Sequence, residues 1–129
     1  MQRDMDLVRD LLLKIASSDQ PLTFPNFLEG EADAEKLRFV AYHLKLLIEE
    51  AGLVSAIDAK SHSGPAWVRM ELTWRGHEFL DQIRDPEIWR KAKAGAAKAG
   101  GFSIDLLSAL AKGLVKKQIE KHTGIELDL

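Results

Sequence analysis

The side chains best suited to metal binding or acid–base chemistry at neutral pH are four histidines: His43, His62, His77 and His122. No two of them follow an H-x-x-x-H or H-E-x-x-H pattern, and the chain has no cysteine to complete a ligand set. His77 directly precedes Glu78, so on a helix the two side chains diverge and cannot act on one substrate atom. The sequence therefore predicts no catalytic site, no metal site and no cofactor, and we expect a protein that is not an enzyme.

A second kind of chemistry is the recognition of DNA by a helix with basic and aromatic side chains. Within residues 34–51, the positions opposite the apolar stripe hold Arg38, Tyr42 and Lys45, with Phe39 and His43 beside them. An arginine can donate two hydrogen bonds to guanine, and a lysine can hold a phosphate. These five residues are the predicted DNA-reading positions.

Another set of DNA contacts is predicted in and beside a polar loop, residues 60–66. Lys60, His62 and Arg69 could touch the DNA backbone or the minor groove from there. The alternative is a hairpin tip that is simply solvated.

The same helix has a plainer interpretation. Tyr42 and His43 would fill the edge of the core, and Arg38 and Lys45 would belong to a solvated face that also carries acidic residues, namely Glu35, Glu49 and Glu50. Glutamates close to phosphate would repel it. Both interpretations stay open at the level of the sequence.

The elements that position these residues follow from apolar spacing and from turn signals. Helical spacing predicts a helix over residues 4–16, and a short strand follows at 22–24. Asp33 can cap the helix that ends before Gly52. Alternation then predicts strands at 53–59 and 67–73, and Thr73 can cap a helix from Trp74 to about Arg84.

This order of helix, short strand, helix, strand, loop, strand and helix is that of a winged helix-turn-helix domain. One departure concerns the segment from Pro25 to Asp33, which has room for a loop but hardly for the positioning helix that normally precedes the recognition helix. We expect that helix to be missing or compressed into residues 27–29.

The C-terminal part is predicted to be entirely helical. Asp85-Pro86-Glu87 is a strong helix start, and Ser103 can cap a last helix after Gly100-Gly101. The stretch of glycine and alanine at 95–99 leaves little side chain to bury and is expected to be mobile. The last helix has a wide apolar face that could dock within the chain or pair two chains, with four predicted oligomer contacts: Ile104, Leu107, Leu110 and Leu114.

Composition limits the classes of protein that fit. Hydrophobic residues make up 46% and charged residues 29%, as in an ordinary globular domain. The absence of cysteine and of a long apolar segment fits a cytoplasmic protein that does not enter membranes. Residues 1–60 hold 7 Lys and Arg against 11 Asp and Glu, whereas residues 61–129 hold 11 against 9. Basic character is therefore concentrated in the second half.

Three segments together resemble a known family. They are residues 1–9, residues 76–85 and the pair Ile88-Trp89. The chain resembles the DUF2513 family of bacterial and prophage proteins of unknown function, from its first residue to the Gly100-Gly101 region and into the last helix. The resemblance implies a winged-helix fold and a bacterial or phage setting, and it brings no activity and no functional residues.

The prediction is thus an α+β, mostly helical chain. Residues 1–84 form a winged helix-turn-helix domain with a two- or three-stranded antiparallel sheet, and residues 85–129 form a helical extension that packs on it or makes an oligomer interface. The leading hypothesis is a transcription-regulator-like protein that binds double-stranded DNA, and its last helix could pair two chains into a homodimer. The alternative is a module on the same scaffold that has lost DNA binding and binds another protein.

Overall fold

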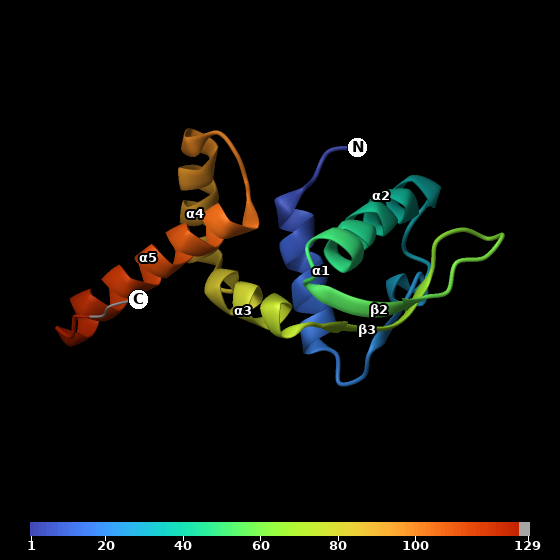
Figure 1. The fold of residues 1–129 in the computed structure, drawn as a ribbon, viewed down its shortest axis with the longest axis horizontal. Coiled ribbons are helices and arrows are strands. Elements are labelled where there is room, and N and C mark those ends of the chain that lie inside the picture. Colours follow the sequence, from blue (N-terminus) through green and yellow to red (C-terminus); the bar gives the residue numbers. More distant parts are fainter. Residues whose placement is uncertain (127–129) are drawn as a thin grey trace. The chain divides into compact units, whose positions relative to one another are not determined.

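The computed structural model describes residues 1–126, and it divides into two compact units. The first unit comprises residues 1–78, and the second begins at Phe79. The sequence prediction placed its domain boundary after Arg84, whereas the two units of the structure meet within the helix α3 (Trp74–Ile83). Figure 1 shows the helices and strands along the chain.

The first unit begins with α1 (Met5–Ser17), as the apolar spacing predicts. The carboxylate of Asp4 accepts hydrogen bonds from the backbone N–H groups of Asp6 and Leu7, at 3.0 and 3.1 Å, and so satisfies two donors at the helix start. The buried face consists of Met5, Val8, Leu11, Leu12 and Ile15. This face contacts β3 and α2 and forms one side of the core.

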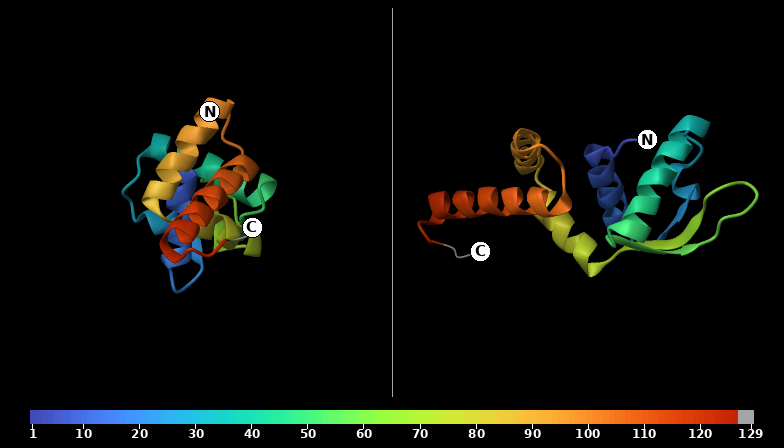
Figure 2. Two further views of the ribbon diagram at one scale, coloured as in Figure 1. Left: turned by 90° about the vertical axis from the view of Figure 1, so that its left-hand side faces the viewer. Right: turned by 45° about the horizontal axis from the view of Figure 1, so that its top comes forward.

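Three strands form an antiparallel sheet in the order β1-β3-β2: β1 (Leu22–Phe24), β2 (Val54–Asp58) and β3 (Trp67–Leu72). Val54 pairs with Leu72 and Asp58 with Trp67, with an irregularity between Ser55 and Ile57. The connecting loop, residues 59–66, extends beyond the paired strands and is called the wing below (Figures 1 and 2). The predicted strands and hairpin are confirmed.

The helix predicted at 34–51 forms α2 (Ala34–Lys45), which continues into a π-helical turn (Leu46–Glu50). The carboxylate of Asp33 accepts a hydrogen bond from the Lys36 N–H at 2.8 Å, as expected of a cap. Gly52 has a φ of +68°, the left-handed conformation in which glycine avoids the strain of a Cβ atom. Between β1 and α2 lies only a 3₁₀ turn (Asn26–Leu28), so this segment holds no full helix, as predicted.

The junction between β3 and α3 is held by Thr73. Its hydroxyl donates a hydrogen bond to the Gly52 carbonyl at 2.6 Å and accepts one from the Gly76 N–H at 3.0 Å. Trp74, the first residue of α3, is 80% exposed. The first turn of α3 presents position 74 outward because Gly76 is the position that faces the Leu53 backbone.

In the second unit the end of α3 is followed by α4 (Pro86–Ala99) and α5 (Ile104–Thr123), which are joined by a short loop and contact each other. Asp85 caps α4 and Ser103 caps α5, as predicted. The segment expected to be mobile is a regular part of α4 instead. Small side chains there are used for close packing, because Ala92 and Ala96 are fully buried and a Cβ at Gly95 would lie 3.2 Å from the Leu110 side chain.

The fold class is therefore α+β and mostly helical with a three-stranded antiparallel sheet, as the sequence predicts. In the first unit, α1 is followed by β1, a 3₁₀ turn, α2 with its π-helical turn, and the hairpin of β2 and β3. Within residues 1–126, none of the helices combines the length and the apolar character needed to cross a membrane.

Candidate functional site

One side of α2 carries residues 38, 42 and 45, which share a face because they are four and three positions apart. The cap at Asp33 fixes where the helix starts, and the buried side chains of Val40 and Leu44 hold the opposite side in the core. Arg38 and Lys45 are exposed and Tyr42 is half-buried between them. The predicted helix face therefore exists, and its residues are accessible.

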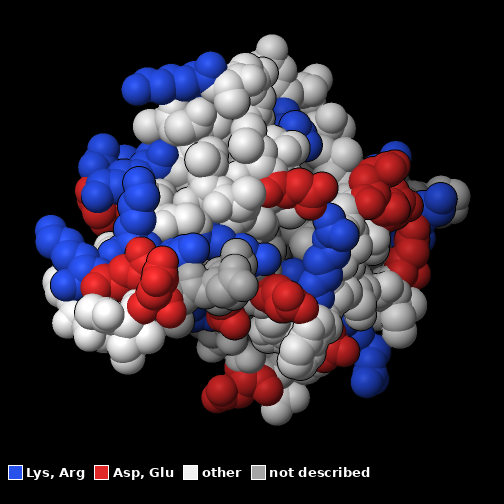
Figure 3. All heavy atoms as spheres, turned by 60° about the vertical axis from the view of Figure 1, so that its left-hand side comes forward, with Lys and Arg blue, Asp and Glu red and all other residues white. Residues whose placement is uncertain are grey.

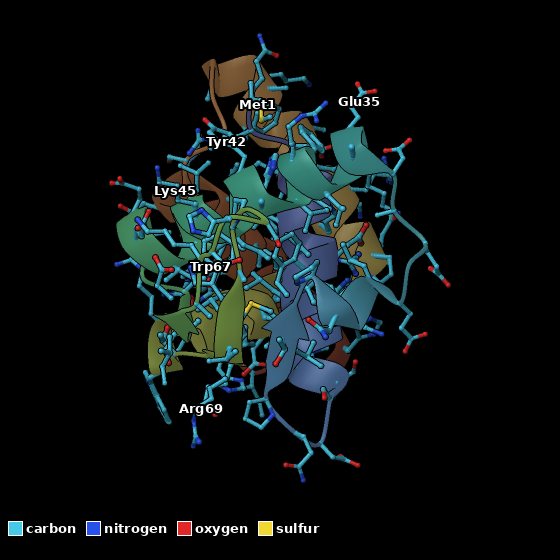
Figure 4. The ribbon with its side chains drawn as sticks, turned by 90° about the vertical axis from the view of Figure 1, so that its right-hand side faces the viewer. Met1, Glu35, Tyr42, Lys45, Trp67 and Arg69 are labelled. Carbon is cyan, nitrogen blue, oxygen red and sulfur yellow. The ribbon has the colours of Figure 1, made fainter. Side chains whose placement is uncertain are left out.

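This face of α2 forms one wall of an open groove with a volume of about 630 Å³. The other walls come from the end of β1, from the wing and its flanking strands, and from Met1. Figure 4 shows Met1, Tyr42, Lys45 and Trp67 on this side of the first unit. The residues that line it are Met1, Phe24, Pro25, Ala34, Leu37, Arg38, Ala41, Tyr42, Lys45, Glu49, Asp58, Lys60, Ser63, Pro65 and Trp67. We call it the α2–wing groove.

Three basic side chains reach the α2–wing groove from two elements that are distant in sequence. Arg38 and Lys45 come from α2, and Lys60 comes from the wing. In the part of the chain that the structure describes, none of the three takes part in an ion pair. Their charges are therefore available to an anionic partner.

Two carboxylates also line the α2–wing groove. Asp58 accepts a hydrogen bond from the Lys60 N–H at 2.8 Å, so one of its carboxylate oxygens is directed toward the backbone two residues further on. Glu49 lies one turn beyond Lys45 and marks that end of the helix face. The lining thus has three cations and two anions, and its basic part is centred on Tyr42.

Four of the eight predicted DNA contacts meet in this groove: Arg38, Tyr42, Lys45 and Lys60. The remaining four do not line it. His62 is exposed at the wing tip, and Arg69 projects from β3 away from Tyr42 and Lys45 (Figure 4). Phe39 lies on another side of α2, where its ring packs edge-on against that of His43 at 4.6 Å.

His43 is a correction to the sequence prediction, because it is fully buried and cannot touch DNA. Position 43 shares the inward side of α2 with Val40 and Leu44. Its Nε2 lies 2.8 Å from the backbone N of Asp4, and its Nδ1 lies 2.9 Å from the Phe39 carbonyl oxygen. Both ring nitrogens are used within the fold.

Of the four predicted oligomer contacts on α5, one is buried and three are partly accessible. Leu107 is fully buried, so it is not available to contact a second chain. Ile104, Leu110 and Leu114 are half-buried and keep part of their apolar surface accessible. Figure 3 shows a face of the molecule on which Lys and Arg groups alternate with Asp and Glu groups, without one continuous basic stripe.

Several residues of the α2–wing groove were not found from the sequence. Met1, Pro25 and Pro65 bring apolar surface to it, and Asp58 brings a carboxylate. The two prolines lie next to predicted strands, and this position alone does not indicate that they form a wall. Among residues 1–126, no group of three His, Asp or Glu is placed to hold a metal ion.

Comparison with known proteins identifies the family. Residues 2–103 match the family described as "Hypothetical protein (DUF2513)". A protein of Haemophilus influenzae (strain ATCC 51907 / DSM 11121 / KW20 / Rd) named "Uncharacterized protein" is 34% identical over 122 residues, which cover 92% of this chain and 99% of that relative. No solved structure matches the chain. The chain belongs to the DUF2513 family, as the sequence resemblance predicts.

Proposed function

We propose that this protein binds DNA through the α2–wing groove and acts as a transcription-regulator-like protein. The observation that carries the proposal is the convergence of Arg38, Lys45 and Lys60, all without an ion pair among residues 1–126, on one open groove. In this arrangement α2 faces the bases, and the sugar-phosphate backbone lies between the helix and the wing.

The electrostatics of the first unit make this binding weak and dependent on salt. Residues 1–78 hold 9 Lys and Arg against 13 Asp and Glu, so attraction comes from the groove and not from the unit as a whole. Three phosphate contacts predict a slope of about −2.7 in a plot of log affinity against log salt concentration. Binding should therefore be strong only at low salt.

The test is fluorescence anisotropy of a labelled duplex at several salt concentrations. The Arg38→Ala/Lys45→Ala variant should lose most of the binding and reduce the slope by about 2, while its thermal midpoint stays nearly unchanged. A matched control, Lys14→Ala/Lys98→Ala, removes two exposed lysines that do not line the groove and should bind as the parent does. Absence of duplex binding at low salt would falsify the proposal.

A second candidate function is the binding of another protein chain, which the half-buried apolar side chains of α5 favour. Ile104, Leu110 and Leu114 keep apolar surface accessible, and a second copy of the chain would cover such a row in a homodimer. Light scattering measures the oligomeric state directly. Leu114→Lys should convert a dimer to a monomer, and a strict monomer of the parent protein at high concentration contradicts this candidate.

A further inference from the structure

We infer that the α2–wing groove holds an unpaired DNA strand, with one base against Tyr42 and its phosphates on the surrounding cations. This inference rests on the proposed function and specifies the form of DNA that the groove prefers. The inference is drawn from the apolar floor of the groove, because a groove that contacts only phosphates has no need of an apolar floor. Leu37, Ala41 and Tyr42 of α2 face Pro25 and Pro65 across it.

The volume and the apolar lining of the groove favour a strand over a duplex. A volume of about 630 Å³ falls within the range of roughly 300–1,000 Å³ that small organic ligands occupy. A B-form duplex keeps its bases stacked, so it offers the groove base edges and charged backbone but no base face, and the apolar floor would remain largely in contact with water or ions. A single strand has free bases, which can cover that floor.

The placement of charge around Tyr42 supports the same arrangement. Arg38 lies about one helical turn before Tyr42 and Lys45 about one turn after it, so the two cations are about 10 Å apart along the helix. Phosphates on either side of a base that stacks on the Tyr42 ring would meet one cation each. An aromatic ring between cations is the arrangement by which proteins bind single strands without reading their sequence.

The third cation and the two carboxylates limit how the strand can lie. Lys60 faces α2 from the wing and would hold the strand from the opposite wall. Glu49, one turn past Lys45, repels a phosphate at that end of the face, and Asp58 is engaged with its own backbone. The strand would therefore cross the groove at Tyr42 and would not continue along α2 to residue 49.

The first experiment compares three labelled probes on the unaltered full chain at low salt: a short oligothymidine, a strand of equal length without bases, and a duplex of equal length. We expect the oligothymidine to bind at least about fivefold more tightly than either other probe, because only it offers bases for stacking. Equal affinity for the strand without bases would overturn the inference. Equal or tighter binding of the duplex would also overturn the inference but would leave the proposed function intact. If none of the three probes binds, the inference and the proposed function are both overturned.

The second experiment separates base stacking from general attraction for polyanions. Tyr42→Phe keeps the ring and should keep the preference for the oligothymidine, whereas Tyr42→Leu should reduce its affinity to that of the strand without bases. Phe39→Leu is the matched control, because it removes an aromatic ring of the same helix that does not line the groove. Thermal midpoints establish that the variants fold. If Tyr42→Leu does not fold, the comparison of the three probes on the parent protein tests the inference. Displacement of the oligothymidine by polyglutamate at equal charge would overturn the inference.

Discussion

The Nε2 atom of His43 accepts a hydrogen bond from the backbone N–H of Asp4 at 2.8 Å, across 39 positions of sequence. Because an amide N–H can only donate, Nε2 carries no proton, and the Nδ1–H then donates to the Phe39 carbonyl at 2.9 Å. The ring therefore ties the start of α1 to the last turn of α2. It also holds the segment that places Met1 at the α2–wing groove.

Replacement of His43 by alanine should destabilise the first unit by about 2–4 kcal/mol. The change leaves the Asp4 N–H without its partner, removes the side-chain hydrogen bond to the Phe39 carbonyl and opens a cavity where a fully buried ring stood. Urea unfolding followed by circular dichroism measures the loss. His62→Ala at the exposed wing tip is the control and should change stability by less than about 0.5 kcal/mol. Equal stability of the two variants would show that the His43 contacts contribute nothing.

The boundaries of the helices could be predicted because they depend on local chemistry. Asp33, Thr73, Asp85 and Ser103 each hydrogen-bond to a backbone N–H within three residues, so the sequence alone identifies them as caps. The burial of His43 and the exposure of Trp74 depend instead on contacts between distant segments. Periodicity indicated which face of α2 is accessible, and it could not distinguish a histidine that points outward from one that bonds to Asp4.

For the same reason, the sequence predicted only the wall of the candidate site that α2 forms. Arg38, Tyr42 and Lys45 follow one helical face, which spacing identifies. The opposite wall depends on how the wing folds back toward α2 and on where Pro25 leaves β1. The irregular pairing between Ser55 and Ile57, opposite the region of Arg69, has no sequence signal such as glycine, so the departure of Arg69 from the site could not be foreseen.

Replacement of Gly76 by alanine should be severely destabilising. A Cβ at position 76 would lie 2.0 Å from the Leu53 carbonyl oxygen, and because that neighbour is backbone, either the helix or the strand must shift. We expect a loss of about 3 kcal/mol or more, measured as a lower thermal midpoint.

The matched control is another helical glycine, Gly113 in α5, where an added Cβ meets nothing within 4 Å. Gly113→Ala should stabilise the protein by up to about 1 kcal/mol, because alanine is the better helix former. Tolerance of alanine at position 76 would mean that α3 and Leu53 do not approach as closely as the structure shows.

Replacement of Arg69 by glycine should stabilise the first unit relative to replacement by alanine. Arg69 has a φ of +56°, a left-handed conformation that costs a residue with a Cβ about 1–2 kcal/mol. Glycine removes this strain but loses about 0.5–1 kcal/mol more backbone entropy in a strand, so we expect a net advantage of about 0.5–1 kcal/mol in chemical unfolding.

The same pair of variants tests the limits of the candidate site. Because Arg69 does not line the α2–wing groove, both substitutions should leave duplex affinity within about twofold of the parent, whereas Lys45→Ala should not. A loss of binding in both Arg69 variants would show that the DNA-contacting surface extends beyond the groove.

The exposed cluster at the start of α4 gives a prediction for pH dependence. Hydrogen bonds from the Arg90 guanidinium to Glu87, at 2.5 and 3.1 Å, together with the charges of Arg90 and Lys91, lower the pKa of the Glu87 carboxyl below its ordinary value of 4.5. A carboxyl whose pKa is lower in the folded state stabilises that state at pH values above the ordinary pKa. This contribution is lost as the pH falls through the lowered value. It should be small, because both side chains are well exposed to solvent.

An NMR titration of the Glu87 side-chain carboxyl measures the shift directly. In the parent protein its midpoint should lie below 4.5, and Arg90→Gln should move it most of the way back, because the hydrogen bond from Arg90 is the largest cause. Lys91→Gln should move it less, since the Lys91 ammonium lies 3.9 Å from the carboxylate and acts through charge alone. An unchanged midpoint in Arg90→Gln would mean that the guanidinium does not hold Glu87 in solution.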